Sequence, residues 1–116
     1  DLVDRYKNKI MLDGHNNVYR FDFRNSSITR PYTKALKAME VRTIGAGRQD
    51  ELENGDVFIA EEESGRLLRL TPETVKWEFV RRIDENHVSL LNWARYLTAE
   101  QVQSVLPKLK NASCEN

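Results

Sequence analysis

Four short strands separated by close turns are predicted between residues 48 and 82, and this pattern narrows the choice of fold more than any other part of the chain. The strands are expected at Gln49–Glu53, Asp56–Glu61, Gly65–Leu70 and Val75–Phe79. The last of them alternates apolar and polar residues with period two, which is typical of a strand with one buried face. Asn54-Gly55 separates the first two, and this pair is the strongest short hairpin signal because both residues tolerate positive φ. The pattern predicts a four-stranded antiparallel sheet.

A four-stranded antiparallel unit of roughly forty residues is typical of a propeller blade. The N-terminal third carries a weaker version of the pattern, with strands expected at Lys9–Leu12, Tyr19–Phe23 and Val41–Ile44 and one or two helical turns at Thr33–Glu40. We therefore predict an all-β fold with a partial or irregular blade and linker over residues 1–47 and a complete blade over 48–82. A propeller closes with ~4–8 blades, so these 116 residues hold about two blades of a larger ring.

Residues 83–116 are predicted to form a C-terminal extension with a helix at about 98–109 and a mobile tail. Thr98 and Gln101 are spaced as a capping box, in which each side chain bonds the backbone of the other residue. Apolar residues then recur at helical spacing, and Pro107 is expected to bend or end the helix. The apolar positions are Val102, Val105, Leu106 and Leu109.

Composition excludes several classes of protein. Eighteen Lys and Arg balance eighteen Asp and Glu, so we expect no nucleic-acid partner, because phosphate binding needs a basic surplus or a basic face. The longest apolar runs are only about four residues, so no transmembrane segment is predicted. Cys114 is a single cysteine and the chain has two histidines, which exclude an internal disulfide and a structural zinc site of Cys and His ligands.

The order of motifs along most of the chain resembles the order found in the arylsulfotransferase-like β-propeller family. That family repeats an Asn-Gly-Asp turn, an apolar strand, Gly-Arg-Leu, a proline turn and a Trp-Glu-aromatic strand. The resemblance extends from about Asp1 to Leu97, and its C-terminal part is carried by Asn92–Leu97. The segments that match the repeated phrase are Arg48–Glu62, Ser64–Arg69, Thr71–Glu73 and Lys76–Val80.

The resemblance implies a six-bladed propeller whose channel binds an aryl sulfate. In such enzymes a channel histidine takes the sulfuryl group and passes it to a phenol, with no metal and no organic cofactor. The nucleophilic histidine would fall at or before Asp1, so its position is not found in this chain. The implied partners are an aryl sulfate, a phenol and the remaining blades, in the same or another chain. The implied location is periplasmic, secreted or membrane-associated.

Arg48 and Gln49 are the predicted substrate-binding residues, because they open the strand that would line the channel. The same arginine has a second interpretation, in which it joins neighbouring blades through a carboxylate. His15 is a catalytic candidate at the channel mouth, although its turn-like surroundings favour a solvated residue. A surface role is favoured for His87, which follows an acid pair.

Other motifs receive structural interpretations. The acidic run Glu61–Glu63 lacks the alternating ligands of a calcium loop and is expected to be a solvated turn. Aromatic and apolar strand residues are predicted to pack between blades, while Trp93 and Tyr96 are expected to anchor the C-terminal segment. The predicted packing residues are Phe58, Leu68, Trp77 and Phe79. The sequence also contains two N-glycosylation sequons, which begin at Asn25 and Asn111.

Two functions of different classes follow. The first is the C-terminal part of an arylsulfotransferase-like enzyme. The alternative is a non-catalytic propeller fragment that acts as a structural, assembly or binding module, because an incomplete ring exposes strand edges that pair readily with other chains.

Overall fold

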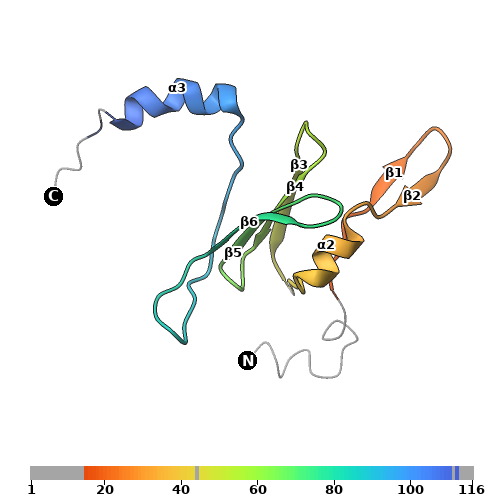
Figure 1. The fold of residues 1–116 in the computed structure, drawn as a ribbon, viewed down its shortest axis with the longest axis horizontal. Helices are drawn as coiled ribbons and strands as arrows, with labels where there is room; N and C mark the ends of the chain where they lie inside the picture. Colours follow the sequence, from red (N-terminus) through yellow and green to blue (C-terminus); the bar gives the residue numbers. More distant parts are fainter. Residues whose placement is uncertain (1–14, 44, 111, 113–116) are drawn as a thin grey trace.

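A four-stranded antiparallel sheet forms the centre of the computed structural model, which describes residues 15–43, 45–110 and 112 (Figure 1). The strands lie in chain order and are β3 (Gly47–Glu51), β4 (Val57–Glu61), β5 (Arg66–Leu70) and β6 (Val75–Val80). This confirms the predicted sheet. The first strand begins and ends two residues earlier than predicted, because its polar sequence carries no alternation and its bounds follow from pairing with β4.

The first hairpin is closed by a longer turn than the two-residue turn that the sequence predicted. The Leu52 amide donates to the Asp56 carbonyl at 2.8 Å, and the Gly55 amide donates to the Leu52 carbonyl at 2.9 Å. Gly55 has φ +82°, which is the left-handed residue that ends a three-residue hairpin loop. Asn54 contributes through its side chain, since its Oδ1 accepts from the Asp56 amide at 3.1 Å.

The N-terminal third does not repeat the blade within the described residues. It contains a two-stranded sheet of β1 (Arg20–Asp22) and β2 (Ser27–Thr29), followed by the predicted helical turns as α2 (Thr33–Ala38). The Asn25 side chain closes the turn between these strands by accepting from the Ser27 amide at 3.0 Å, and Ser27 begins β2. The predicted strand at Val41 is absent over residues 41–43, and the one at Lys9–Leu12 lies outside the described residues.

The hydrophobic core lies between α2 and one face of the four-stranded sheet, which we call the helix face. Residues alternate across a strand, so Val57 and Ile59 of β4 share this face with Leu68 and Leu70 of β5. They pack against the helix and the segments that flank it, and all are buried. The partners across the core are Val18, Tyr32, Ala35, Leu36 and Val41.

The opposite face of the sheet is covered by an extended segment, residues 92–98, which we call the strap. We call this side of the sheet the strap face. Tyr96 packs on Phe58 with ring centroids 5.9 Å apart, and its hydroxyl accepts from Arg69 Nη1 at 3.1 Å. Phe58 is therefore buried, as predicted, and Tyr96 anchors the strap. Trp77 and Phe79 stack on each other but remain 47% and 44% exposed.

The described residues leave these two aromatics half-exposed, and their packing between blades stays a prediction. The strap covers the middle of the sheet and leaves part of β6 in contact with solvent. Leu68, by contrast, is fully buried on the helix face. Trp93 anchors the strap only weakly, since it is 67% exposed beneath the Arg48 guanidinium.

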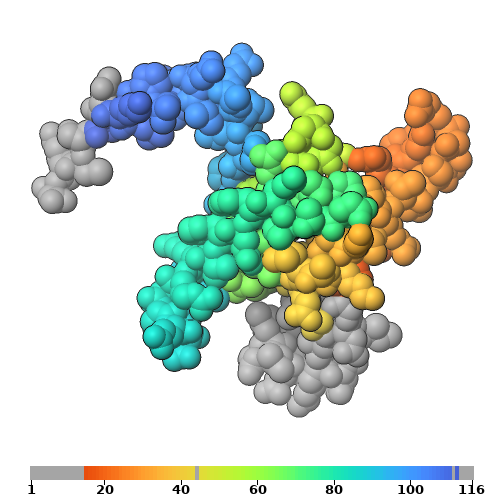
Figure 2. Space-filling model, viewed as in Figure 1, coloured from red at the N-terminus to blue at the C-terminus, as the bar shows by residue number. Residues whose placement is uncertain are grey.

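The C-terminal helix α3 (Ala99–Lys110) begins at the predicted capping box. The Thr98 amide donates to Gln101 Oε1 at 2.9 Å, and the Gln101 amide donates to Thr98 Oγ1 at 3.3 Å. Pro107 lies inside the helix and does not end it. No residue of α3 is buried, and the helix stands away from the sheet (Figures 1 and 2). None of the described helices is long and apolar enough to cross a membrane.

Candidate functional site

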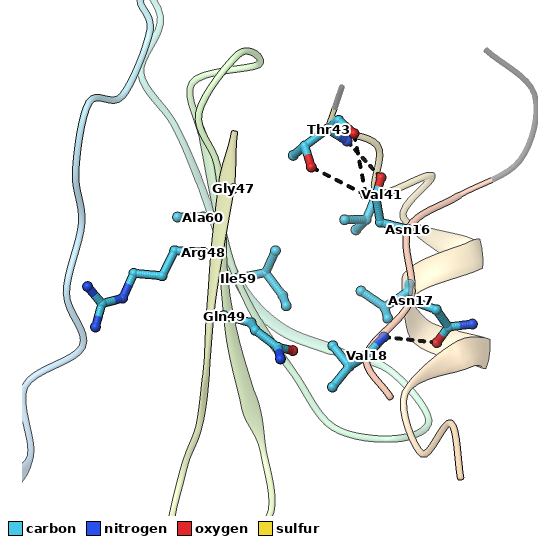
Figure 3. Close-up of a pocket in the computed structure, with 11 residues that line it drawn as sticks. Asn16, Asn17, Val18, Val41, Thr43, Gly47, Arg48, Gln49, Ile59 and Ala60 are labelled. Atoms are coloured by element: carbon cyan, nitrogen blue, oxygen red, sulfur yellow. Dashed lines mark hydrogen bonds between the residues drawn. The ribbon is translucent and has the colours of Figure 1, made fainter. Parts of the chain in front are cut away.

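Arg48 and Gln49 lie side by side on β3, but their side chains do not converge on one site. Figure 3 shows them leaving opposite sides of the strand, Gln49 toward Val18 and Arg48 away from it. The register explains this, because Arg48 is opposite Ala60 and Gln49 is opposite Ile59, and neighbouring residues of a strand face opposite ways. The two predicted substrate-binding residues therefore belong to different faces of the sheet.

The Arg48 guanidinium is held by groups on its own face. Its Nε and Nη2 donate to the Asp50 carboxylate at 3.2 and 3.3 Å, and its carbon lies 5.4 Å from the ring centre of Trp93. The side chain remains 36% exposed. The carboxylate partner comes from the same strand, so the positive charge is locally balanced while the Nη1 group remains available as a donor.

Gln49 borders a hollow of about 150 Å³ between β3 and the N-terminal segment (Figure 3). Asn16 fixes the wall of this hollow. Its Oδ1 accepts from the Thr43 amide at 2.7 Å, and its backbone N–H donates to the Val41 carbonyl at 2.8 Å. Ligand pockets usually measure about 300–1,000 Å³. This hollow is therefore large enough for a small group only.

A larger hollow of about 460 Å³ opens on the strap face, between the first hairpin and the start of α3. Three arginines and three acids line it, and these are Arg48, Arg69, Arg95, Asp50, Glu51 and Glu53. These charges balance one another, so the hollow presents guanidinium donors without a strongly positive surface.

Arg69 is fixed in this hollow by an ion pair, since its Nε donates to Asp56 Oδ2 at 2.7 Å. The Asn54 side chain and then Arg69 hydrogen-bond to the Asp56 carboxylate and hold its pKa below the usual value. The same ion pair raises the pKa of the Arg69 guanidinium. Asp56 therefore couples the hairpin loop to the arginine beneath the strap.

Neither histidine lines either hollow. His15 is half-buried, and its Nε2 has no hydrogen-bond partner among the described residues. His87 is exposed, as expected, with Nδ1 2.8 Å from the Asp84 carboxylate. The Asn86 amide and then His87 hydrogen-bond to that carboxylate and lower the pKa of Asp84. Neither histidine contributes to the site around Arg48 in the described structure.

Glu61 is a buried charge, so its predicted place in a solvated turn is wrong. It is 1% exposed, and its Oε1 accepts from the Arg42 amide at 2.7 Å while Oε2 pairs with Arg66 Nε. The period of two gives the signal that was missed, because Glu61 shares the buried face with Val57 and Ile59. Within the part of the chain that the structure describes, no group of three or more His, Cys, Asp or Glu residues is placed to hold a metal ion.

The chain was compared with protein-family models, with curated proteins and with solved structures. No family model, no curated protein and no solved structure matches it. The description of the site therefore depends on its own geometry and on the order of its motifs.

Proposed function

We propose that this chain is the C-terminal part of an arylsulfotransferase-like propeller enzyme. The enzyme transfers a sulfuryl group from an aryl sulfate to a phenolic acceptor through a histidine that lies outside this chain. The observation that carries the proposal is the meander β3-β4-β5-β6 with Arg48 on its first strand. The motif order of the sequence supplies the family resemblance.

Apolar side chains lie on both faces of the sheet, which supports a blade that packs between two neighbours. All five residues of β4 are buried, although the strand is only five residues long. The helix face is covered by α2, and the strap face still exposes Trp77 and Phe79. Large half-exposed aromatics on one face indicate a surface that another element covers. A neighbouring blade is the element that the proposal places there.

The chemistry assigned to this chain is binding of sulfate oxygens by Arg48. Asp50 and Trp93 orient the guanidinium and leave Nη1 as a donor. A planar guanidinium matches the oxygens of a tetrahedral anion, and charge-assisted hydrogen bonds are stronger than neutral ones. An imidazole nitrogen would form a bond to sulfur as the phenolate leaves, and the acceptor phenol would then displace the imidazole. No cofactor takes part in either step.

The experiment is aryl sulfate turnover by the natural full-length protein and by Arg48→Ala. Loss of a charge-assisted bond to substrate should raise KM about tenfold to a hundredfold. Arg24→Ala is the matched control, because Arg24 also pairs with an aspartate two residues away and is 90% exposed. Absence of turnover, or equal effects of the two substitutions, would contradict the proposal.

The second candidate is a non-catalytic module that binds other chains, and one observation favours it. Trp77 and Phe79 are part of β6, which is an edge strand of the sheet. An exposed apolar face beside an open edge can pair with another sheet. This candidate predicts association that Trp77→Asp abolishes, measured by sedimentation. A folded chain that stays monomeric at all concentrations would count against it.

A further inference from the structure

A third hollow lies between the strap and the strap face of the sheet, and its volume is about 490 Å³. Small-molecule sites usually measure about 300–1,000 Å³, so this hollow is large enough for a small organic ligand. The residues that line it come from β4, β5 and β6, from the strap and from the start of α3, and none comes from β3. The hollow is therefore formed without Arg48 and the strand that carries it.

The sheet supplies a wall of the hollow that is largely aromatic. Phe58, Arg69 and Trp77 are opposite one another in the register of β4, β5 and β6, so they share one face of the sheet. Phe58 is buried against Tyr96, whereas Trp77 is 47% exposed although it also lines the hollow. A planar aromatic group placed in the hollow would stack on Trp77 and would remove apolar surface of both rings from water.

The charged residues of the hollow are both arginines, and one of them is uncompensated. No acidic residue is among the described residues that line it. The Arg69 guanidinium already has partners, because its Nε pairs with Asp56 and its Nη1 donates to the Tyr96 hydroxyl. Arg95 makes no hydrogen bond or ion pair within the described part of the chain. An anion is therefore the complementary ligand, and apolar walls strengthen its attraction to a guanidinium by excluding water.

We propose that this hollow binds a small planar aromatic anion, with its ring on Trp77 and its acidic group on Arg95. A carboxylate matches the fork of a guanidinium in a bidentate pair. Inorganic phosphate would leave the aromatic wall in contact with water, and an uncharged ring would leave Arg95 without a partner. An aromatic carboxylate satisfies both features. The proposal does not depend on the proposed function, because it uses neither Arg48 nor a histidine.

Two rival occupants would fill the same hollow with protein. Val102 of α3 already lines it, so a tilt of the helix toward the sheet would close it. The neighbouring blade of the proposed function would instead cover Trp77 from outside. Either occupant would exclude a ligand, so a binding measurement on the full chain separates both of them from the proposed site.

The place of binding is tested by titrating the isotope-labelled full chain with naphthoate while the indole N–H signals of the two tryptophans are followed by NMR. Trp77 lines the hollow, whereas Trp93 does not and is the internal reference. A Trp93→Phe variant assigns the two signals. We expect the Trp77 signal to shift to saturation while the Trp93 signal stays in place. Absence of a Trp77 shift, or equal shifts of both signals, would overturn the proposal.

The role of the charge is tested by Arg95→Gln and the matched variant Arg81→Gln. Both substitutions remove an exposed arginine, but Arg81 does not line the hollow. Arg95→Gln should raise the dissociation constant of naphthoate about tenfold, because a charge-assisted hydrogen bond is lost. The dissociation constant of the uncharged naphthamide should stay the same, and Arg81→Gln should change neither value. An unchanged affinity for naphthoate in Arg95→Gln, or equal effects of the two variants, would overturn the proposal.

The use of the hollow itself is tested by Ala94→Phe, which adds a ring to its strap side. This substitution should abolish binding of both naphthoate and naphthamide, while an unchanged urea midpoint shows that the fold is kept. Arg48→Ala should leave the affinity for naphthoate unchanged, so the proposed function and this site can fail separately. Full binding in Ala94→Phe, or loss of binding in Arg48→Ala, would overturn the proposal.

Discussion

Replacing Glu61 by alanine should destabilise the chain more than any other removal of a single charge in the sheet. The carboxylate is buried and holds two partners from different segments, the Arg42 amide and the Arg66 guanidinium. Breaking a buried ion pair by removing one partner costs about 3–5 kcal/mol. Arg66 keeps 19% exposure, a bond to the Met39 carbonyl at 2.9 Å and Glu78 at 3.6 Å. We therefore expect the lower end of that range, about 3 kcal/mol.

A second substitution separates the charge from the hydrogen bond. Glu61→Gln keeps an oxygen that accepts from the Arg42 amide but loses the ionic partner of Arg66. The expected loss is about 1.5 kcal/mol, in line with a hydrogen bond to a charged group. The free energy of unfolding is measured by urea denaturation followed by circular dichroism.

The control is Glu73→Ala, because Glu73 pairs with Lys34 on the surface with both side chains at least 70% exposed. Exposed pairs contribute about 0–1 kcal/mol. If Glu61→Ala and Glu73→Ala lowered the free energy of unfolding equally, the buried-pair reasoning would be refuted.

Two further predictions concern a turn and a titration. Gly65→Ala should cost about 2–4 kcal/mol in urea denaturation, because its φ is +60° and a Cβ would lie 2.1 Å from the Ser89 carbonyl oxygen. A Cβ at Gly55 would have no atom within 4 Å, so Gly55→Ala should cost only about 1–2 kcal/mol for the left-handed backbone conformation. Equal losses of unfolding free energy in the two variants would contradict this. The folded pKa of Asp56 is lowered by Asn54 and Arg69, so its stabilisation is present at neutral pH and is lost as pH falls below about 4 through the lower folded value. Asp56→Asn should weaken the fall in unfolding free energy at acid pH. An unchanged fall would contradict this role of the Asp56 carboxylate.

The four-stranded sheet could be predicted because its turns and alternation are local. Val75–Phe79 shows its period directly, and Asn54-Gly55 marks the first loop even though the turn is longer than the pair implies. The predicted bounds of β3 were two residues too far along the chain. Arg48 to Glu51 are polar on both faces, so the pairing with β4 decides where the strand begins and ends. In the N-terminal third, the strand predicted at Tyr19–Phe23 is too long. Its aromatic residues alternate with polar ones as in a strand, but only Arg20–Asp22 pairs with another strand.

Much less of the site could be predicted. The sequence places Arg48 and Gln49 next to each other, and the alternation of a strand then separates their side chains. The burial of Glu61 depends on Arg66 and on the Arg42 backbone, nineteen residues away from Glu61 along the chain. The exposure of Trp77 depends on where the strap stops. The partners of Glu61 and the exposure of Trp77 are set by tertiary packing. Only the alternation of β4, which places Glu61 on the same face as Val57 and Ile59, is a local signal.

In the proposed function, this chain completes a ring in which a histidine outside this chain carries the sulfuryl group. The most direct measurement is the intact mass of the natural full-length protein after mixing with an aryl sulfate. We expect a gain of one sulfuryl group, which is lost on addition of a phenol and is reduced in Arg48→Ala but not in Arg24→Ala. A protein whose mass stays unchanged under saturating aryl sulfate would contradict it.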